Sequence, residues 1–422
     1  MLKNKLKIAI AGVGTVGNGL LHLLKKYKNK NIEVSAIASR RRLNIDEKYF
    51  KNTVLFKDAK YLLNFSDYDV LVELIGGDSG ISKLIVFDAL KKKKNVVTAN
   101  KALVSKYWND LKELTSLNKC QIKFEAAVAG GIPIIKVIDE FLITNQIRRI
   151  YGILNGTSNY ILSEMLSSNK EFKKILTDAK KLGYAESDPT FDIDGTDASH
   201  KLSILSSLAF CCDMQKIKNE GIQNINLLDL KIADTLGYKI KLLGLTELNK
   251  NNLKCFVYPC LLSKDSFIAK IDGVYNGIVV ESNFCKKSFF VGEGAGSYPT
   301  ATSVLSDIIN LSQNNFDNSE KKISHRYNII NLDDRKGCYY LRFTTDDKSG
   351  VISGIANEFK KFNISMKSML QRDTGKINSS EATIVITTHD CLEKNMMKAL
   401  RRIDNLSFIR QKTVYLRIED FK

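Results

Sequence analysis

The chain has 422 residues, of which 44% are hydrophobic, and a formal net charge of +18 at pH 7, so it is long enough for about two or three domains with ordinary cores. No apolar stretch reaches membrane-spanning length, and Met1-Leu2-Lys3 lacks the apolar core of a signal peptide, which excludes membrane and secreted classes and predicts a cytoplasmic protein. Lysine is spread along the chain without arginine–aromatic interleaving, so no specific nucleic-acid partner is expected.

The amino terminus predicts a Rossmann-type nucleotide-binding unit. An apolar run of strand length, Lys7 to Ala11, leads into a glycine turn and then into a stretch with helical apolar spacing. This order places a pyrophosphate against the amides of a helix N-terminus, with Gly14 allowing close approach. The expected cofactor contacts are Gly12, Val13, Gly14, Thr15, Val16 and Gly17.

The end of the second predicted strand, Ile32 to Ala38, indicates which cofactor is bound. It is followed by Ser39 and three arginines. An NAD-selective site usually carries Asp or Glu here to bind the ribose hydroxyl, whereas arginine favours a 2′-phosphate. We therefore expect a preference for NADP over NAD, with Ser39 and Arg40 as contacts and Arg41 as a solvated neighbour.

The α/β pattern continues with a strand from Val70 to Ile75, a helix from Ser79 to Lys94 and a strand from Val96 to Thr98. The lysines at 91–94 close that helix, where cations favour the negative end of the dipole. Residues 98–101 then lie at the carboxyl end of a strand, where ligands of open α/β sheets bind. They are either part of a ligand site or only the start of a helix.

Two later segments offer ligand-binding groups. Glu125 precedes a glycine-containing turn, and a carboxylate with free carbonyls is the oxygen environment that a hard cation prefers. Residues 155–159, Asn-Gly-Thr-Ser-Asn, join a strand from Ile147 to Leu154 to a helix beginning near Tyr160. Their amides and hydroxyls suit a carboxylate, with helix capping by Thr157 or Ser158 as the structural alternative.

Acidic residues gather between Ala179 and Lys201. Apolar spacing predicts a helix from Asp197 onward, so Asp197 and Lys201 project from one face, one turn apart. Such a pair suits a site in which carboxylates hold an ammonium while a lysine transfers a proton to an alkoxide. A surface ion pair is the alternative.

This segment resembles the signature of the homoserine dehydrogenase family. The signature has Ala, Gly, Asp-Pro, Asp, Gly, Asp and Lys at fixed spacing, and every position is filled, by Ala179, Gly183, Asp188, Pro189, Asp192, Gly195, Asp197 and Lys201. The resemblance covers nearly the whole chain. It implies NAD(P)-dependent interconversion of L-homoserine and L-aspartate 4-semialdehyde in threonine, methionine and isoleucine biosynthesis.

The resemblance also implies the catalytic roles. Lys201 would protonate the forming alkoxide, Glu186 and Asp197 would hold the ammonium and polar end of the substrate, and Asp192 would support the loop or Lys201. Because a donor ammonium works best near ambient pH, Lys201 should be partly desolvated. An NADP-binding amino-acid sensor without catalysis and a related amino- or oxo-acid dehydrogenase are the alternatives.

Further roles follow from the same resemblance. Thr98 and Lys101 would lie by the nicotinamide, with Lys101 contacting cofactor or substrate as a third catalytic residue beside Lys201 and Asp197. The residues implied near the amino acid are Asn155, Gly156 and Thr157. A structural sodium ion would be held by the Glu125 side chain and the carbonyls of Val128, Gly130 and Ile132. Gly183 is assigned to the cofactor.

A second glycine cluster, residues 292–299, precedes a helical run. It either serves the cofactor through Gly294 or forms a tight return of the chain. The resemblance implies a return to the nucleotide domain. The predicted domains are therefore a Rossmann domain, 1–130 completed by about 290–315, and an inserted α+β catalytic and dimerisation domain, 131–290.

The polar stretch 313–336 indicates a linker. Beyond it, predicted elements in the order βαββαβ make a ferredoxin-like unit over 337–422: Cys338–Thr345, Val351–Phe362, Ile364–Leu370, Ala382–Thr388, Cys391–Arg402 and Phe408–Arg417. This unit resembles an ACT regulatory domain, but Ser349 replaces the usual proline of its turn, which loosens that turn. Threonine is the expected effector of a homodimer or homotetramer; a ligand-free oligomerisation module is the alternative.

The remaining patterns narrow the class of protein to which the chain can belong. Eight cysteines show no CxxC pair or Cys/His spacing of a zinc site, so reduced thiols are expected. Four scattered histidines weigh against a histidine-driven dehydrogenase. Because the glycine turn begins at residue 12, no kinase domain is expected ahead of it.

Overall fold

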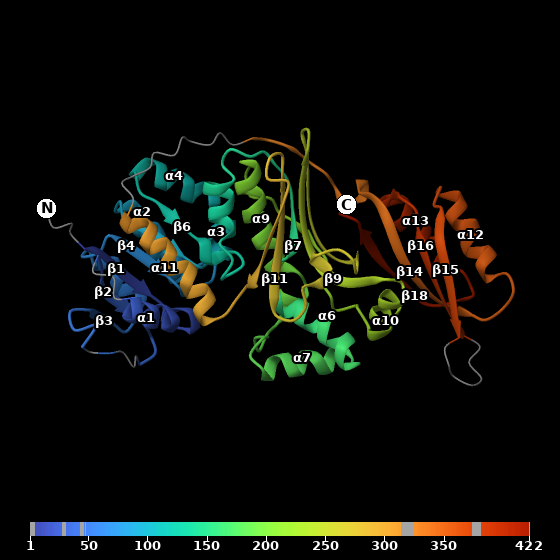
Figure 1. Cartoon of the computed structure of the whole chain (residues 1–422), viewed down its shortest axis with the longest axis horizontal. Helices are drawn as coiled ribbons and strands as arrows, with labels where there is room; N and C mark the ends of the chain where they lie inside the picture. The colour runs from blue at the N-terminus through green and yellow to red at the C-terminus, as the bar shows by residue number, and fades with distance from the viewer. Residues whose placement is uncertain are drawn as a thin grey trace.

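A computed structural model describes residues 5–27, 31–42, 46, 48–313, 325–373 and 381–421. The molecule is elongated, with an amino-terminal sheet, a large central sheet and a carboxyl-terminal α/β part following one another along its length (Figure 1). Within the described ranges, no helix is long and apolar enough to cross a membrane.

The amino-terminal sheet is parallel, with the strand order β3-β2-β1-β4-β5-β6. The order reverses between β1 and β4, which is the Rossmann arrangement and leaves a crevice at the carboxyl ends of these strands. The strands are β1 (Leu6–Ala11), β2 (Ile32–Ala38), β3 (Val54–Phe56), β4 (Val70–Glu73), β5 (Asn95–Thr98) and β6 (Ile122–Lys123). The helices are α1 (Thr15–Tyr27), η1 (Ala59–Asn64), α2 (Gly80–Lys91), α3 (Lys101–Lys106) and α4 (Trp108–Asn118).

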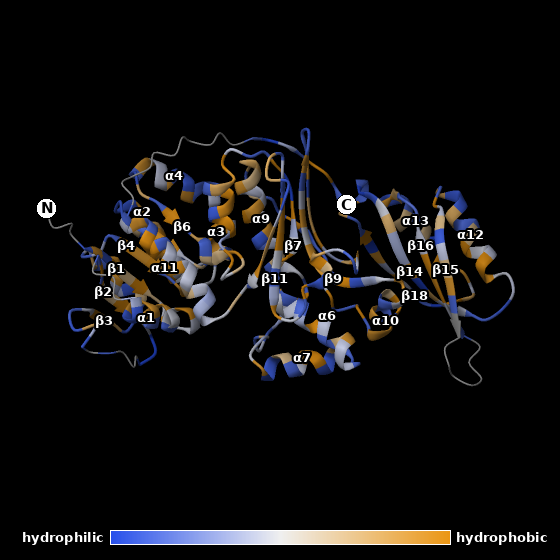
Figure 2. Cartoon of the chain, viewed as in Figure 1, coloured by the Kyte–Doolittle hydropathy of each residue, from blue (hydrophilic) through white to orange (hydrophobic). Residues whose placement is uncertain are grey.

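Helix α11 (Ser297–Gln313) belongs to this first sheet although it comes much later in the chain. Its residues Ala301, Val304 and Ile308 share a hydrophobic core with Ile8 and Ile10 of β1. Figure 2 shows hydrophobic residues gathered on the sheet strands and hydrophilic ones at loop tips such as the β9–β10 turn. The chain therefore leaves the nucleotide sheet, builds the central part and returns.

The central part contributes the first half of a twelve-stranded mixed sheet with the main order β12-β11-β7-β9-β10-β18-β14-β16-β15. Its own strands are β7 (Ile147–Ile153), β8 (Lys218–Asn219), β9 (Tyr238–Asn249), β10 (Asn252–Ser263), β11 (Tyr275–Ser282) and β12 (Lys287–Glu293). Its helices are η2 (Glu125–Ala127), α5 (Ile134–Lys136), η3 (Val137–Phe141), α6 (Gly156–Ser168), α7 (Phe172–Lys181), α8 (Thr190–Ile193), α9 (Thr196–Phe210), α10 (Leu227–Thr235) and η4 (Ile268–Lys270).

Helix α9 confirms the prediction of a helix through Asp197 and Lys201. Leu202, Ile204 and Leu205 are fully buried in the central core, and α9 contacts α3 of the nucleotide part. The helix thus begins where the two parts meet.

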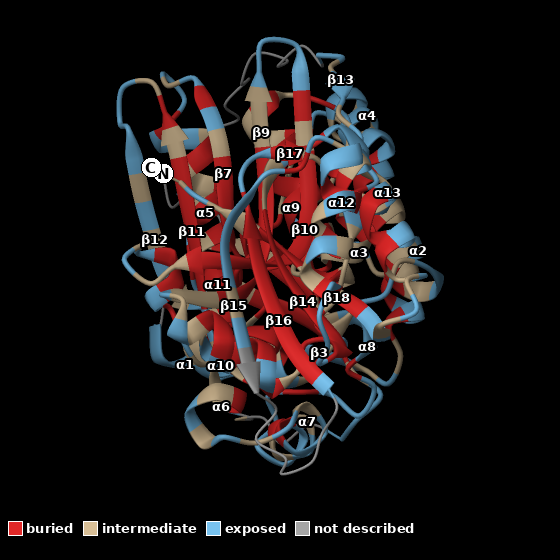
Figure 3. Cartoon of the chain, turned by 90° about the vertical axis from the view of Figure 1, so that its right-hand side faces the viewer, coloured by how far each residue is buried: buried red, intermediate tan, exposed pale blue. Residues whose placement is uncertain are grey.

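The carboxyl-terminal part has the expected βαββαβ order: β14 (Lys336–Asp346), α12 (Val351–Lys361), β15 (Met366–Asp373), β16 (Glu381–Thr388), the short β17 (Cys391–Leu392), α13 (Glu393–Ile403) and β18 (Ile409–Glu419). Strand β18 pairs in parallel with β10, placing Arg417 opposite Cys260. The carboxyl-terminal and central parts therefore share one sheet. Figure 3 shows its middle strands buried, whereas β12 and β15 carry exposed residues at the edges.

Two segments of the structure differ from the predicted ones. Within the predicted linker, residues 314–324 lie outside the described residues, but β13 (Asn328–Ile329) pairs with β10 and η5 (Leu332–Asp334) follows. This part of the predicted linker is thus held to the central sheet, and buried Leu332 and Arg335 anchor its polar stretch. The helix expected from Cys391 begins instead at Glu393, since Cys391 pairs with Gly337 in β17.

Candidate active site

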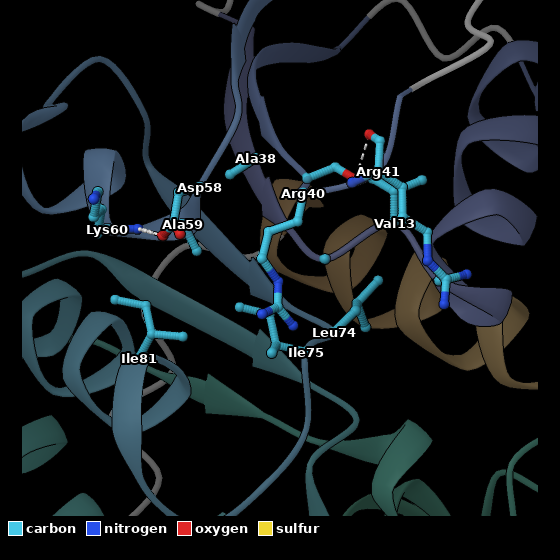
Figure 4. Close-up of a pocket in the computed structure, with 13 residues that line it drawn as sticks. Val13, Ala38, Arg40, Arg41, Asp58, Ala59, Lys60, Leu74, Ile75 and Ile81 are labelled. Carbon is cyan, nitrogen blue, oxygen red and sulfur yellow. Dashed lines mark hydrogen bonds between the residues drawn. The ribbon is translucent and has the colours of Figure 1, made fainter.

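A cavity of about 510 Å³ opens at the carboxyl ends of β1, β2 and β4 (Figure 4). Its lining includes Gly12, Val13, Gly14, Ser39, Arg40 and Lys60. This is the edge of the sheet at which the glycine turn was predicted to bind a dinucleotide.

The glycine turn fits such a ligand. Gly12 has φ +100°, and a Cβ there would lie 2.8 Å from the Leu74 backbone. A Cβ at Gly17 would lie 2.3 Å from the Gly12 carbonyl oxygen, so α1 packs closely on the turn. A Cβ at Gly14 would have no atom within 4 Å among the described residues other than those next to it in the chain. The backbone is therefore open at the position where a pyrophosphate approaches.

Ser39 and Arg40 lie at the rim of this cavity. The Ser39 hydroxyl donates to the Arg41 carbonyl (3.1 Å) and accepts from the Arg41 amide (3.2 Å), which closes a tight turn. In Figure 4 the Arg40 side chain extends across the cavity towards Ile75, and Arg41 also lines the cavity, with its side chain running in a different direction. Lys60, which no sequence pattern predicts, adds a third cation to the lining, after Arg40 and Arg41.

A buried carboxylate organises the neighbouring strand ends. Glu73, at the end of β4, accepts from Ser82 Oγ (2.7 Å), from two amides of the following loop and from Thr98 Oγ1 (2.6 Å). Thr98 accepts in turn from the Asn100 amide, and the Asn100 side chain caps α3. No motif predicts Glu73; a single acid ending an apolar strand is the only signal. The start of α3, with Lys101, is held rigidly.

Lys101, Asp197 and Lys201 converge at the junction of the two parts. Lys101 Nζ lies 2.8 Å from Asp197 Oδ1, and Lys201 Nζ lies 2.8 Å from Asp197 Oδ2. Lys201 also donates to the Leu154 carbonyl at 2.8 Å. Asp197 is 6% and Lys201 8% exposed, which rules out an ordinary surface ion pair.

The charges of this cluster stabilise one another. Burial alone would raise the pKa of Asp197, but the charges of Lys201 and Lys101 outweigh it and hold the pKa below its usual range. The charge of Asp197 raises the pKa of Lys101. Burial, together with the charge of Asp197, raises the pKa of Asp192. An ionised carboxylate is thus held between two ammonium groups.

Asn155 joins the acids to α6. Its Oδ1 accepts from the Ser158 amide (2.7 Å), and its Nδ2 donates to Asp192 Oδ1 (2.7 Å) and Asp197 Oδ2 (2.9 Å). The helix begins at Gly156, not near Tyr160, and Asn155 caps it. Capping by Thr157 or Ser158 is therefore wrong. The Thr157 hydroxyl donates instead to the Tyr184 carbonyl at 2.6 Å.

Gly183 and Glu186 lie on the loop after α7. Gly183, at φ +76°, ends that helix, since its amide donates to the Lys180 carbonyl and the Tyr184 amide donates to the Ala179 carbonyl. Glu186 is exposed, and its charge contributes to the raised pKa of Lys101. Contact of Gly183 with a cofactor and of Glu186 with a substrate stays a prediction.

Gly294 packs close to the Lys201 anchor. A Cβ there would lie 2.1 Å from Cγ of Asn276, a fully buried residue. The Asn276 Nδ2 donates to the Leu154 carbonyl (3.1 Å), which is also the acceptor for Lys201. The small residue at 294 therefore leaves room for a side chain that fixes this carbonyl.

Most of the predicted sodium ligands already accept hydrogen bonds, and a sodium site here stays a prediction. Both Glu125 oxygens accept hydrogen bonds from backbone amides at the start of α5, at 2.8 and 2.9 Å. The Gly130 carbonyl accepts from Ser303 Oγ (2.6 Å), and the Ile132 carbonyl accepts from an amide of the next turn (2.8 Å). The Glu125 side chain and two of the three predicted carbonyls thus already accept hydrogen bonds. The third predicted carbonyl is that of Val128. Among the described residues, no group of three or more His, Cys, Asp or Glu could hold a metal ion.

The Glu125 carboxyl instead predicts a pH-dependent stability. Burial raises its pKa from 4.5 to about 7, so the folded protein keeps a proton that the unfolded chain loses near pH 4.5. This contribution is complete below pH 4.5, and the free energy of unfolding should fall by roughly 3 kcal/mol as the pH rises through about 7. Urea titrations from pH 5 to 8 should show a smaller fall in Glu125→Gln than in wild type or in the control Glu247→Gln. Equal falls in all three proteins would contradict the assignment.

Comparisons with known proteins agree on one family. Residues 133–309 match the family model for homoserine dehydrogenase, and residues 12–125 match the model for the homoserine dehydrogenase NAD binding domain. The homoserine dehydrogenase of Neisseria gonorrhoeae is 36% identical over 98% of both chains.

Solved structures give the same result. A homoserine dehydrogenase from Thiobacillus denitrificans is 35% identical, with a TM-score of 0.91 over 99% of each chain. A hyperthermophilic archaeal homoserine dehydrogenase mutant in complex with NADPH is 27% identical, with a TM-score of 0.63 over 74% of this chain and 100% of that one.

Proposed function

The chain belongs to the homoserine dehydrogenase family, and on that premise we propose how its residues carry out the reaction. The activity is that of an oxidoreductase of amino-acid biosynthesis, which interconverts L-homoserine and L-aspartate 4-semialdehyde with a nicotinamide cofactor. The observation that supports our assignment of roles is the ion-paired cluster of Lys101, Asp197 and Lys201 between the nucleotide and central parts, in which Asp197 and Lys201 are buried. A homoserine-dependent rise in NADPH absorbance tests the activity directly.

Lys201 is proposed as the proton donor. When bound, the nicotinamide supplies the hydride for the aldehyde carbon. Lys201 Nζ gives its proton to the aldehyde oxygen in this direction and takes it back in homoserine oxidation. An ammonium has three hydrogens, and two have acceptors among the described residues, Asp197 and the Leu154 carbonyl. The third is left for the substrate oxygen, and Asp197 holds Lys201 Nζ in position through its ion pair.

The substrate's own ammonium is proposed to bind the acidic loop. Glu186 offers an exposed carboxylate close enough for its charge to act on Lys101. Asp192 is oriented by the Asn155 amide. The turn Asn155-Gly156-Thr157 completes this side of the site, because its backbone lies at the N-terminus of α6 and suits the substrate carboxylate.

We propose NADP as the preferred cofactor, bound with its 2′-phosphate between Ser39, Arg40 and Lys60. Hydrogen bonds to charged groups contribute about 1.5–3 kcal/mol, so Arg40→Ala should raise the KM for NADPH about tenfold or more and leave the KM for NADH nearly unchanged. Initial rates with each cofactor measure this effect. Arg42→Ala is the matched control, because Arg42 is exposed and is not among the residues that line the cavity. A wild-type preference for NADH, or equal effects in both variants, would contradict the proposal.

The carboxyl-terminal part is proposed to be an ACT domain with threonine as its effector. Support comes from the strand order β18-β14-β16-β15 and from the turn ahead of α12, where Gly350 has φ +90°. Saturating threonine should lower the initial rate and raise the thermal midpoint, whereas serine at the same concentration should not. If threonine changes neither quantity, this part acts without that ligand.

The domain bounds and a homo-oligomeric state are also proposed. The Rossmann domain comprises 1–130 and about 290–315, with the catalytic and dimerisation domain as 131–290 and the ACT domain from about 337. A homodimer or homotetramer is supported by edge strand β12, whose Phe289 and Val291 are 45% and 46% exposed. Unpaired apolar edges favour association with another chain. Light scattering of the purified protein measures the subunit number.

A further inference from the structure

A buried arginine links the carboxyl-terminal part to the central part. Arg417 on β18 is 2% exposed. Its two terminal nitrogens donate to the two oxygens of Glu220, at 2.7 and 2.8 Å. Its Nε donates to Glu393 of α13 at 3.1 Å. The two-point contact with Glu220 fixes both the position and the orientation of that carboxylate.

Glu220 belongs to a short segment that holds the loop ahead of α9. On one side of Glu220, Asn219 Nδ2 donates to the Asp194 carbonyl at 2.7 Å. On the other side, the Ile222 amide donates to the Ile193 carbonyl at 2.8 Å. Residues 219–222 therefore contact both residues that directly precede Gly195, the N-cap of α9.

This segment packs closely against the loop. A Cβ at Gly221 would lie 2.2 Å from the Ile193 carbonyl oxygen and 2.5 Å from Asp194 Cα. The Glu220 amide is also fixed, because it donates to the Val257 carbonyl of β10 at 2.8 Å. A shift of the Glu220 side chain would thus be passed to the loop through its neighbours.

We propose that Glu220 and Arg417 are positioning residues for the reaction. Arg417 holds Glu220, the segment 219–222 holds residues 193–195, and α9 then begins with Asp197 only two residues later. The position of strand β18 is in this way transmitted to Asp197 and Lys201, although neither Glu220 nor Arg417 contacts them. A misplacement of about 1 Å at reacting groups can cost as much as 10²-fold in rate.

The test compares two glutamates of the same interface. Glu220→Gln should raise the KM for homoserine and lower kcat, together reducing kcat/KM about tenfold, with the KM for NADP unchanged because the nucleotide cavity lies elsewhere. Glu419→Gln is the matched control. Glu419 accepts from Arg335 (2.6 Å) and from the Tyr258 hydroxyl (2.8 Å) but, among the described residues, no hydrogen bond or ion pair joins it to the loop ahead of α9.

Both variants should lower the thermal midpoint, and only Glu220→Gln should change the KM for homoserine. Simple loss of folded enzyme lowers the rate without altering KM, so this split separates positioning from stability. If Glu220→Gln does not purify folded, Glu220→Asp, which keeps the charge and shortens the side chain, is measured in the same way. An unchanged homoserine KM and kcat, or equal effects in both variants, would overturn the proposal. The proposal depends on the roles of Asp197 and Lys201, which the Lys201 variant tests separately.

Discussion

Lys201→Met should lower kcat by about 10² to 10⁴, the range for removing a positioned general acid. The methionine preserves most of the side-chain volume but has no proton to give to the substrate oxygen. Binding of NADP should change little, because the nucleotide cavity is lined by other residues. Steady-state rates in both directions and fluorescence titration with NADPH measure the two quantities.

Lys92→Met is the matched control for that variant. Lys92 forms an ion pair with Asp88 at 2.7 Å and the same i,i+4 spacing, at the end of α2. Its side chain is 40% exposed, and exposed pairs of this kind contribute little to stability. Turnover in the control should stay within about twofold of wild type. Full activity in Lys201→Met would remove Lys201 from the mechanism.

Asp197→Asn should lower kcat/KM by about 10² or more, because the charge that orients both lysines is lost. The buried ammonium of Lys201 and the partly exposed ammonium of Lys101 would then lie close together without their counterion. Leaving such charges uncompensated should also lower the free energy of unfolding by about 3 kcal/mol. Activity at increasing homoserine concentration and denaturant titration measure the two effects.

Asp188→Asn tests whether the effect is specific. Asp188 lies on the same acidic loop but is exposed, and its carboxylate accepts from Thr190. It should cost far less in kcat/KM than Asp197→Asn. Comparable losses in the two variants would mean that the loop's overall charge, and not the Asp197 carboxylate between the lysines, supports the reaction.

Local patterns were enough to predict the parts of the site that lie close together in the chain. Strand β2 was predicted with its observed bounds, Ile32–Ala38. The glycine turn fits a dinucleotide because strand, turn and helix are consecutive. The pairing of Asp197 with Lys201 followed from their spacing of four residues on a helix. Each of these features depends on neighbours in sequence.

Contacts between distant segments were beyond such patterns. The resemblance placed Lys101 in the site, but its ion pair with Asp197 depends on how the two parts meet. Asn155 was expected near the substrate, and its use as a cap that also binds two acids appears only in three dimensions. Glu125 looked like a free oxygen ligand, since nothing local indicates that the start of α5 folds back onto its carboxylate. The buried anchors Leu332 and Arg335 were hidden in a polar stretch for the same reason.

The place of β18 in the central sheet has a consequence for synthesis on the ribosome. This strand comes later in the chain than every other strand of the sheet, yet it lies between β10 and β14. Until it emerges, the edge of β10 lacks its partner and buried residues such as Leu261 remain accessible to water and to chaperones. The central sheet can close only after translation of residue 419, so a stalled or shortened chain would expose an apolar strand edge prone to aggregation.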